Sequence, residues 1–249
     1  MTDRPIIFSA PMVNALLDGR KTQTRRLLKP QPEPFRLEDG RECEVGLLHV
    51  EGRPLPSITL GRVITRQDVR FAVGDRLWVR ETFQTAMSDG GPCWLYRANS
   101  DRIYPEFDGP DEGAGPSFNY DKYPSNYAAW ASDVEARGPW RSPIHMPRWA
   151  SRIRLTVTDV RVQRLQEISE ADAIAEGIER INICGAEWNW KLYGGAPNCG
   201  WSDPRQSYQS LWETINGAGS WDANPWIAAV TFTVARRGDD DLFQPPVTK

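Results

Sequence analysis

Four cations and two threonine hydroxyls occupy eight consecutive residues near the start of the chain. Residues 19 to 26 read Gly-Arg-Lys-Thr-Gln-Thr-Arg-Arg. An arginine guanidinium offers a planar fork of donors to a phosphate, and a lysine that loses its charge on burial can act as a base. A threonine hydroxyl beside such a base becomes a nucleophile. The stretch therefore suits a site for an anionic or nucleotide-like ligand, although a solvated basic loop has the same composition.

A short helix is expected in the second half of the chain. Ser169 and Asp172 form the Ser-x-x-acid pattern that begins helices, and Gly177 suits a C-terminal cap. Glu176 falls at the end of that helix. The ordinary interpretation of a glutamate at such a position is a side chain in contact with solvent.

Strand patterns dominate the segments around these residues. Alternating or β-branched apolar residues predict four strands that share one sheet, at residues 6–8, 76–82, 152–162 and 226–234. The connections are irregular and no βαβ alternation or Walker glycine pattern is present. We expect a mixed α+β, mainly β fold: a small, partly closed β-barrel with short helices at its rim.

The domain organisation follows from the spacing of these elements. We expect a single elaborated domain over residues 1–237, with long irregular insertions near 30–65, 98–142 and 180–204. Residues 238–249 are expected to be a disordered tail. Of the 11 tryptophans, Trp78, Trp212 and Trp226 fall on apolar patterns and should be buried, whereas Trp188 and Trp190 are expected to face solvent or a ligand.

Composition limits the remaining classes of function. The four cysteines are scattered and only two histidines are present, so neither a structural zinc site nor a disulfide framework is expected, and no cofactor is expected. No apolar run reaches membrane-spanning length and no signal-peptide pattern is present, which predicts a cytoplasmic protein without membrane contact. The net charge is −3, but basic residues gather at 18–30 and 136–154, which favours a local anionic site.

The basic motif resembles a known signature. Gly19-x-Lys21 followed by Arg26 is similar to the Gly-x-Lys-x-x-x-x-Arg pattern of ASCH domains, which are small β-barrels related to the PUA fold. The stretch also resembles the bacterial N(4)-acetylcytidine amidohydrolases of that superfamily. Leu165-Gln-Glu-Ile-Ser-Glu170 resembles the lead-in to the helix that carries their glutamate. Residues 144–152 and 220–226 look like the larger ASCH-type proteins of phage and prophage genomes, which implies a host cytoplasm for a phage-encoded chain.

The resemblance implies an enzyme and three catalytic residues. Thr24 would attack the acyl carbonyl of an N-acylated cytidine or related modified pyrimidine nucleoside. Lys21 would take the proton of Thr24, and Glu176 would serve the leaving nitrogen. The substrate-binding candidates are charged side chains that can bind a nucleoside or nucleotide: Arg20, Arg25, Arg26, Arg80 and Glu81.

Other classes of function remain open at this point. The related fold binds RNA, so a non-catalytic module for RNA or a modified base is the first alternative. A metal-independent ribonuclease is the second, because lysine, threonine and arginine suit phosphate chemistry. A structural role in phage morphogenesis is the third, and no coiled coil or repeat supports it.

Overall fold

The computed structural model describes residues 3–29, 31, 35–36, 42–43, 69–88, 91–103, 139–183, 187–196 and 199–237. The chain divides into two compact units. Unit 1 comprises Met1–Thr2, Asp18–Arg76 and Leu155–Val234. Unit 2 comprises Asp3–Leu17, Leu77–Arg154 and Ala235–Lys249.

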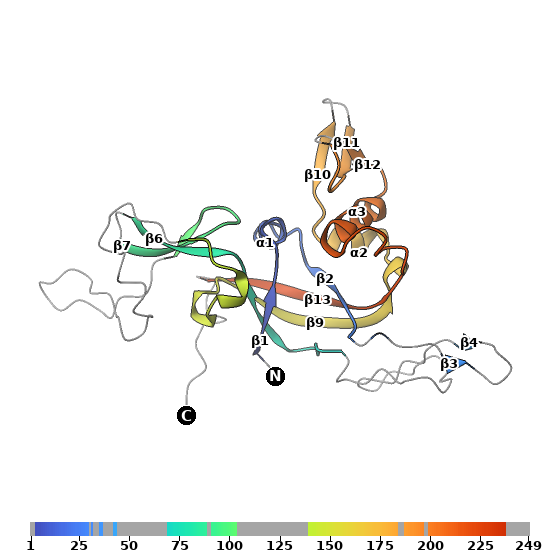
Figure 1. Ribbon diagram of the computed structural model, residues 1–249, viewed down its shortest axis with the longest axis horizontal. Coiled ribbons are helices and arrows are strands. Elements are labelled where there is room, and N and C mark those ends of the chain that lie inside the picture. The colour runs from blue at the N-terminus through green and yellow to red at the C-terminus, as the bar shows by residue number, and fades with distance from the viewer. Residues whose placement is uncertain are drawn as a thin grey trace, which may run out of the picture. The chain divides into compact units, whose positions relative to one another are not determined.

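The largest element is a five-stranded sheet of strands from all parts of the chain (Figure 1). Its strands, in spatial order, are β1 (Asp3–Ile7), β5 (Arg76–Arg80), β9 (Ile153–Arg164), β13 (Trp226–Arg236) and β2 (Gln23–Leu27). Alternation along β9 buries Ile153, Leu155 and Val157, as the apolar pattern predicts. The four strands expected to share one sheet therefore do so. Within the described residues the strands do not close into a barrel, so the confirmed class is mixed α+β, mainly β.

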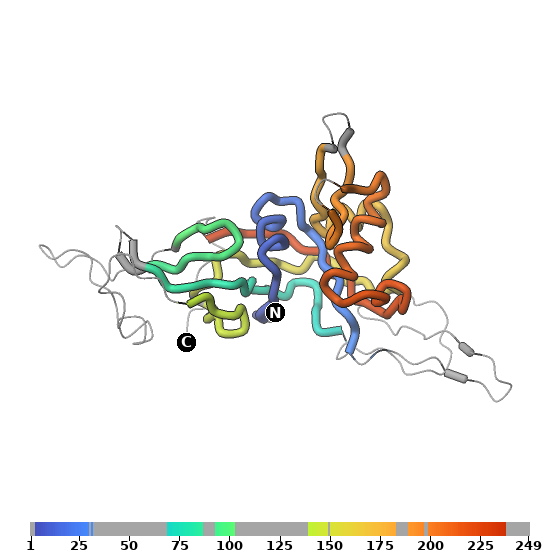
Figure 2. Tube along the Cα trace, turned by 45° about the horizontal axis from the view of Figure 1, so that its top comes forward, coloured from blue at the N-terminus to red at the C-terminus, as the bar shows by residue number. Residues whose placement is uncertain are grey.

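Unit 1 adds two helices and a small antiparallel sheet to its part of these strands. Helix α2 (Glu170–Ala175) begins at Ser169, whose side chain accepts a hydrogen bond from the Asp172 amide, and helix α3 (Pro204–Asn216) begins with its proline in the first turn. Figure 2 shows these helices beside the small sheet. That sheet consists of β10 (Arg180–Ile183), β11 (Glu187–Lys191) and β12 (Gly200–Trp201). A two-residue pair, β3 (Phe35–Arg36) with β4 (Glu42–Cys43), completes the unit.

Unit 2 contains one helix and a β-hairpin with a short third strand. Helix α1 (Ala10–Leu17) buries Val13 and Leu16 completely. The sheet is β6 (Phe83–Ser88), β7 (Gly91–Tyr96) and β8 (Arg102–Ile103). Two 3₁₀ turns, Pro143–His145 and Arg148–Ala150, lie between this sheet and β9 in the chain.

Of the segments expected to be irregular insertions, the structure describes one almost completely and the others only in small part. Residues 180–204 are not irregular, because they carry the sheet of β10, β11 and β12. Most of 30–65, residues 104–138 of the segment at 98–142, and the tail at 238–249 lie outside the described residues. No helix in the described part of the chain is long and apolar enough to cross a membrane.

The tryptophan expectations are confirmed in part. Trp78 and Trp212 are buried, with 7% and 5% of their surface exposed. Trp226 is only half-buried, because it lies at the first position of β13. Trp190 is also half-buried, and the side chain of Trp188 lies outside the described residues.

Candidate functional site

The basic motif forms the start of β2 and joins the end of α2. Gly19 adopts a left-handed turn with φ +74°. Lys21 then forms an antiparallel bridge with Glu176, and the Thr22 amide donates to the Ala175 carbonyl at 2.8 Å. The backbone therefore fixes two sequence-distant residues side by side before any side chain is considered.

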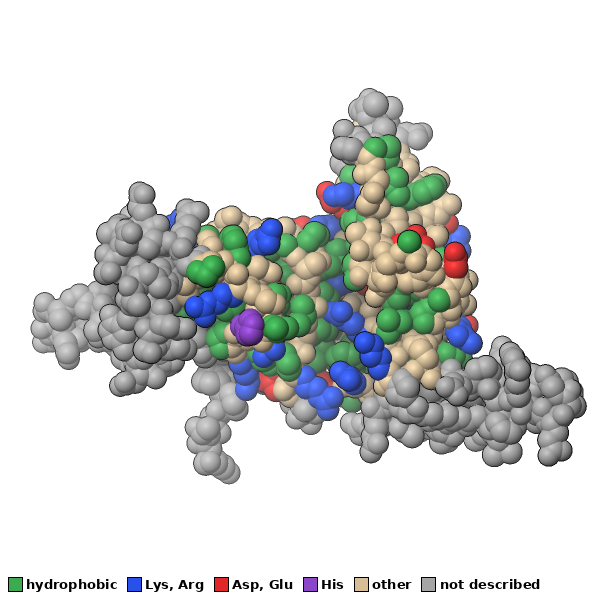
Figure 3. All heavy atoms as spheres, viewed as in Figure 1, with side chains coloured by type: hydrophobic (Ala, Val, Ile, Leu, Met, Phe, Trp, Pro, Cys, Tyr) green, Lys and Arg blue, Asp and Glu red, His purple; other side chains and the backbone are tan. Residues whose placement is uncertain are grey.

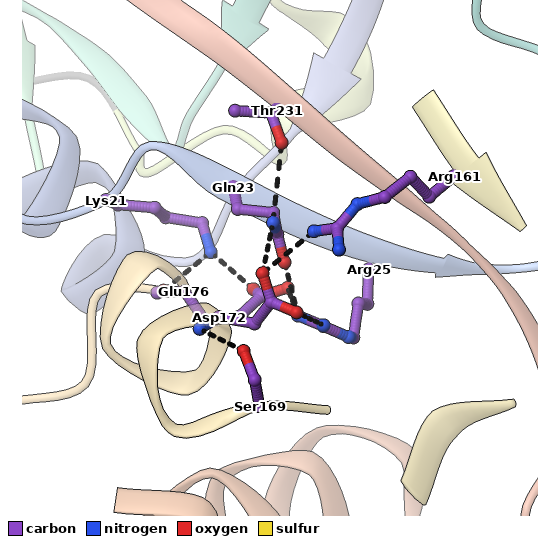
Figure 4. A network of polar contacts seen from close by, with 8 residues as sticks. All are labelled: Lys21, Gln23, Arg25, Arg161, Ser169, Asp172, Glu176 and Thr231. Carbon is purple, nitrogen blue, oxygen red and sulfur yellow. Dashed lines mark hydrogen bonds and ion pairs between the residues drawn. The ribbon is translucent and has the colours of Figure 1, made fainter. Parts of the chain in front are cut away.

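The side chains of Lys21 and Glu176 make a buried ion pair within unit 1. Lys21 Nζ lies 2.8 Å from Glu176 Oε2 and donates to the Glu176 main-chain oxygen at 2.7 Å (Figure 4). The two side chains are only 2% and 4% exposed. The structure thus brings together the lysine and the glutamate that the sequence proposed as partners, and the solvated-loop interpretation does not describe Lys21.

Burial changes the proton affinity of the lysine. Desolvation lowers the pKa of Lys21 below its ordinary value, and the charges of Arg26 and Arg25 lower it further, whereas Glu176 opposes the shift. A lysine of lowered pKa is neutral in a larger fraction of molecules. It can therefore accept a proton more readily than a solvated lysine.

A network of further polar side chains surrounds this pair. Arg25 reaches Glu176 Oε1 at 3.2 Å and Asp172 Oδ2 at 3.1 Å. Gln23 Nε2 donates to Asp172 Oδ1 at 3.0 Å and to the Thr231 hydroxyl at 3.3 Å. Figure 4 shows Gln23 and Arg25 of β2, together with Lys21 just before this strand, on one side of the network and α2 on the other.

Asp172 is the most strongly bonded acid of the network. It accepts 2.8 Å and 3.0 Å hydrogen bonds, from Arg161 and Gln23 respectively. Burial raises its pKa, but these hydrogen bonds and the charges of Arg25 and Arg161 outweigh that effect and lower the pKa to about 2. Asp172 is therefore ionised at neutral pH and fixes the orientation of Arg25.

The helix geometry explains why α2 presents both acids. Asp172 and Glu176 are four residues apart, so they lie on the same side of a helical turn. Ser169 caps the start of α2 through the Asp172 amide at 3.1 Å. Gly177 has φ +84°, which allows the chain to leave the helix directly after Glu176.

Along strand β2, Thr24 alternates with Gln23 and Arg25. In the antiparallel register, Gln23 pairs with Thr231, Thr24 with Val230 and Arg25 with Ala229. Successive side chains of a strand point to opposite faces, so Thr24 does not share the face of Gln23 and Arg25 that meets Asp172. Thr24 is buried, with 4% of its surface exposed.

The remaining candidates of the basic motif have distinct surroundings. Arg26 lies on the same face of β2 as Thr24, pairs with Ala228 of β13, and is half-buried. Arg20 donates to the Gly177 carbonyl at 2.9 Å and pairs with Asp18 at 2.8 Å, on the exposed side of the same turn. Arg20 therefore lies beside the residue that follows Glu176.

Arg80 and Glu81 belong to unit 2 and have partners there. Glu81 forms a bidentate pair with Arg152, with both N–O distances 2.8 Å, and the two side chains are 2% and 5% exposed. Arg80 donates to the Ile144 carbonyl at 3.1 Å and lies 4.4 Å from the centre of the Trp78 ring. Glu81 is thus neutralised by Arg152 and is not an open ligand for a substrate.

Three members of the network were not singled out from the sequence. Gln23 stood between the threonines, Asp172 was interpreted as a helix-start residue, and Tyr208 was given no role in the site. The Tyr208 ring lies 5.7 Å from the Arg25 guanidinium, and burial raises the pKa of its hydroxyl well above the ordinary value. The four-residue spacing of Asp172 and Glu176 was the available signal for Asp172; none was available for Tyr208.

Searches for similar proteins do not identify this chain. No protein-family model, curated protein or solved structure matches it. Among the described residues, no group of three or more His, Cys, Asp or Glu could hold a metal ion. The chemistry of the site is therefore argued from its own residues.

Proposed function

We propose that this protein is a hydrolase that removes the acyl group from an N-acylated cytidine or a related modified pyrimidine nucleoside. The observation that carries the proposal is the buried contact of 2.8 Å between Lys21 Nζ and Glu176 Oε2. This contact joins the two residues to which the resemblance assigns proton transfer, although 155 positions separate them. We further propose that the five-stranded sheet and α2 form the core of an ASCH-type, PUA-like fold.

The proposed reaction is acyl transfer to threonine followed by hydrolysis. Neutral Lys21 takes the proton of the Thr24 hydroxyl as its oxygen attacks the acyl carbon. The proton passes across the Lys21–Glu176 contact, and Glu176 delivers it to the amide nitrogen as the C–N bond breaks. Water then attacks the threonine ester and gives its proton to Glu176. The proton passes through Lys21 to the Thr24 oxygen as the ester C–O bond breaks, and the products are the free nucleoside and a carboxylic acid.

The arginines of the motif have a separate role in this proposal. Arg25 is fixed by Asp172 and Glu176, so it positions Glu176 and stabilises its carboxylate. Arg20 and Arg26 are the more accessible cations of the motif. They are assigned to binding the nucleoside, or the phosphate of a nucleotide.

The strand register favours a second candidate, a binding module for a modified base without catalysis. Thr24 is in the alternate row of β2, and Lys21 and Glu176 already satisfy one another. In this alternative the ion pair holds α2 against β2. The two candidates differ in what the Thr24 hydroxyl does.

A turnover assay with matched threonine variants separates the candidates. The protein is incubated with N(4)-acetylcytidine, and cytidine and acetate are measured by chromatography. Thr24→Val keeps the shape of the buried side chain but removes the nucleophile, so kcat should fall by a factor of about 1,000 or more. Thr24→Ser keeps a hydroxyl and should retain measurable turnover.

Two further variants test the proton-transfer pair. Glu176→Gln cannot shuttle a proton and should reduce kcat by about 100-fold or more. Lys21→Met should be at least as damaging. Binding of acetylcytidine without turnover by the wild-type protein, together with unchanged affinity in Thr24→Val, would reject the hydrolase and support the binding module.

A further inference from the structure

Tyr208 is a buried aromatic residue beside the polar network that the proposed reaction does not use. It lies on α3 with 3% of its surface exposed, and its ring centre is 5.7 Å from the Arg25 guanidinium. A cation over a ring at this distance is attracted to it, most strongly where water is excluded. The Arg25 side chain is fully buried. Figure 3 shows mostly green and tan side chains at the place where Figure 1 shows α2 and α3, so the charges of the network are not displayed there.

Hydrogen bonds fix only part of the Arg25 guanidinium. Its Nη1 donates to Gln23 and, at 3.2 Å, to Glu176 Oε1, and its Nη2 lies 3.1 Å from Asp172 Oδ2. Its Nε makes no hydrogen bond to any residue that the structure describes. The orientation of this guanidinium therefore also depends on the Tyr208 ring that it faces.

The loop after α3, at residues 217–225, holds Tyr208 through Trp221. The two rings meet edge to face, with their centres 6.2 Å apart and an angle of 70° between their planes. Aromatic pairs favour this arrangement. Asn224 of the same loop has φ +40°, a left-handed conformation that asparagine adopts more readily than most residues.

The same loop is tied to the segment that leads into α2. Gln166 Nε2 donates to the Trp221 carbonyl at 3.0 Å, and the Gln166 amide donates to Asn224 Oδ1 at 2.9 Å. Arg164 donates to the Asn224 carbonyl at 3.1 Å. Gln166 belongs to a 3₁₀ turn between β9 and α2. The loop therefore contacts both Tyr208 and the segment before the helix that ends at Glu176.

We propose that Tyr208 and the loop at 217–225 are positioning elements for the Lys21–Glu176 pair, and that they act through Arg25. The ring holds Arg25 Nη1 against Glu176 Oε1, and Glu176 Oε2 in turn meets Lys21 Nζ at 2.8 Å. The turnover part of this inference rests on the proposed function. The titration of Lys21 tests the inference without any turnover.

The charges around Lys21 give the direction of the expected effect. Desolvation is the main cause that lowers the pKa of Lys21; Glu176 opposes it, and Arg26 and Arg25 of β2 add to it. The same three charges surround the Tyr208 hydroxyl, and burial followed by Glu176 keeps its pKa raised, so this group stays protonated. Loss of the ring frees Arg25 and admits water. Both changes weaken the causes that lower the pKa of Lys21, so this pKa should rise.

The first experiment follows Lys21 by NMR during a pH titration. The chain has five lysines, and the ¹³Cε resonance of Lys21 is assigned by its loss in Lys21→Met. In Tyr208→Leu the titration midpoint of Lys21 should rise by about 0.5 pH unit or more. Tyr208→Phe keeps the ring over Arg25, so its midpoint should stay within about 0.2 pH unit of the wild type.

Two further variants separate positioning from general packing. Leu211→Val is the matched control, because Leu211 is buried on the same helix and its change loosens the packing of α3 without removing a ring. It should lower the stability in urea and leave the Lys21 midpoint within about 0.2 pH unit. Trp221→Leu leaves α3 intact and should raise the midpoint in the same direction as Tyr208→Leu, by a smaller amount.

The second experiment measures turnover of N(4)-acetylcytidine against pH. Tyr208→Leu should reduce kcat about fivefold or more with KM changed less than about twofold, and the rise of kcat with pH should move upward with the Lys21 midpoint. An unchanged midpoint in Tyr208→Leu or in Trp221→Leu, or an equal rise in Tyr208→Phe or in Leu211→Val, would overturn the proposal. If the wild type does not turn over acetylcytidine, the proposed function fails, while the titration still decides the role of Tyr208.

Discussion

Lys21 and Glu176 form a buried ion pair, so replacing either residue should clearly change the stability of the protein. Each is buried and charged, so removal of one partner leaves the other in a poorly solvated place. Glu176→Gln should reduce the free energy of unfolding by about 3 kcal/mol. Lys21→Met should cost less, because Arg25 still compensates Glu176. Urea denaturation of both variants measures these losses.

The double variant provides the control for that prediction. When both partners are replaced, no uncompensated charge remains, so Lys21→Met with Glu176→Gln should be more stable than the sum of the two single losses indicates. Strict additivity of the three free energies would contradict a direct interaction between the side chains.

The lowered pKa of Asp172 predicts how the stability of the fold depends on pH. Its pKa of about 2 in the folded protein lies below its ordinary value near 3.9. A carboxyl group with a lowered pKa stabilises the fold above pH 4, and this contribution is lost as the pH falls from about 4 to about 2. Solvent screening reduces the contribution to roughly 1 kcal/mol.

Asp172→Asn should remove this part of the acid dependence. Chemical denaturation at pH 6 and pH 3 measures it: the difference in stability between wild type and variant should be larger at pH 6. A difference that is the same at both pH values would show that the Asp172 contacts do not stabilise the ionised form.

At the residue level, the structure brings together two of the residues that the sequence motif had named. Lys21 and Glu176 were paired by the motif and by the position of the helix end. Gln23 and Tyr208 were not found, because their roles depend on strand register and on the packing of α3, which no local pattern encodes. The same register separated Thr24 from the row of Gln23 and Arg25.

At the scale of elements, the cap of α2 controls the position of two acids. The Ser169 hydroxyl oxygen accepts a hydrogen bond from the Asp172 amide at 3.1 Å. Helix α2 has only six residues, so this cap matters for its geometry. Ser169→Ala should destabilise the protein by about 1 kcal/mol. It should also reduce any turnover of acetylcytidine, because Glu176 lies at the other end of α2. Thermal unfolding and the turnover assay measure the two effects.

Ser169→Thr is the conservative comparison, since it keeps the hydroxyl at the cap. It should restore most of the stability and activity that Ser169→Ala loses. An alanine variant as stable as the wild type would mean that the Ser169 hydroxyl does not hold the start of α2.

Element prediction worked for long apolar patterns and failed for the small sheet of unit 1. Strands β9 and β13 are 12 and 11 residues long and alternate clearly. Strand β12 has two residues, too few for a periodic signal. Its pairing is set by cross-strand contacts: Arg180 lies opposite Trp190, Trp190 opposite Trp201, and the Arg180 guanidinium is 4.9 Å from the Trp190 ring.

At the scale of the whole molecule, the net charge is divided almost evenly between the two units. Over the full sequence, unit 1 carries 17 cations and 19 acids, and unit 2 carries 13 cations and 14 acids. Basic residues nevertheless gather locally at 18–30 and 136–154, which the net charge of −3 does not reveal.

Burial of the proposed catalytic pair predicts how turnover responds to salt. The Lys21–Glu176 pair is buried and acetylcytidine is uncharged, so hydrolysis should change less than about twofold between roughly 50 and 300 mM salt.

The response is measured by chromatography of released cytidine at each salt concentration. Potassium chloride and potassium glutamate should give the same result, since the argument depends on ionic strength. If turnover fell steeply with salt, the hydrolase site would itself depend on exposed cations, and Arg20 and Arg26 would replace the buried pair as the main determinants of turnover.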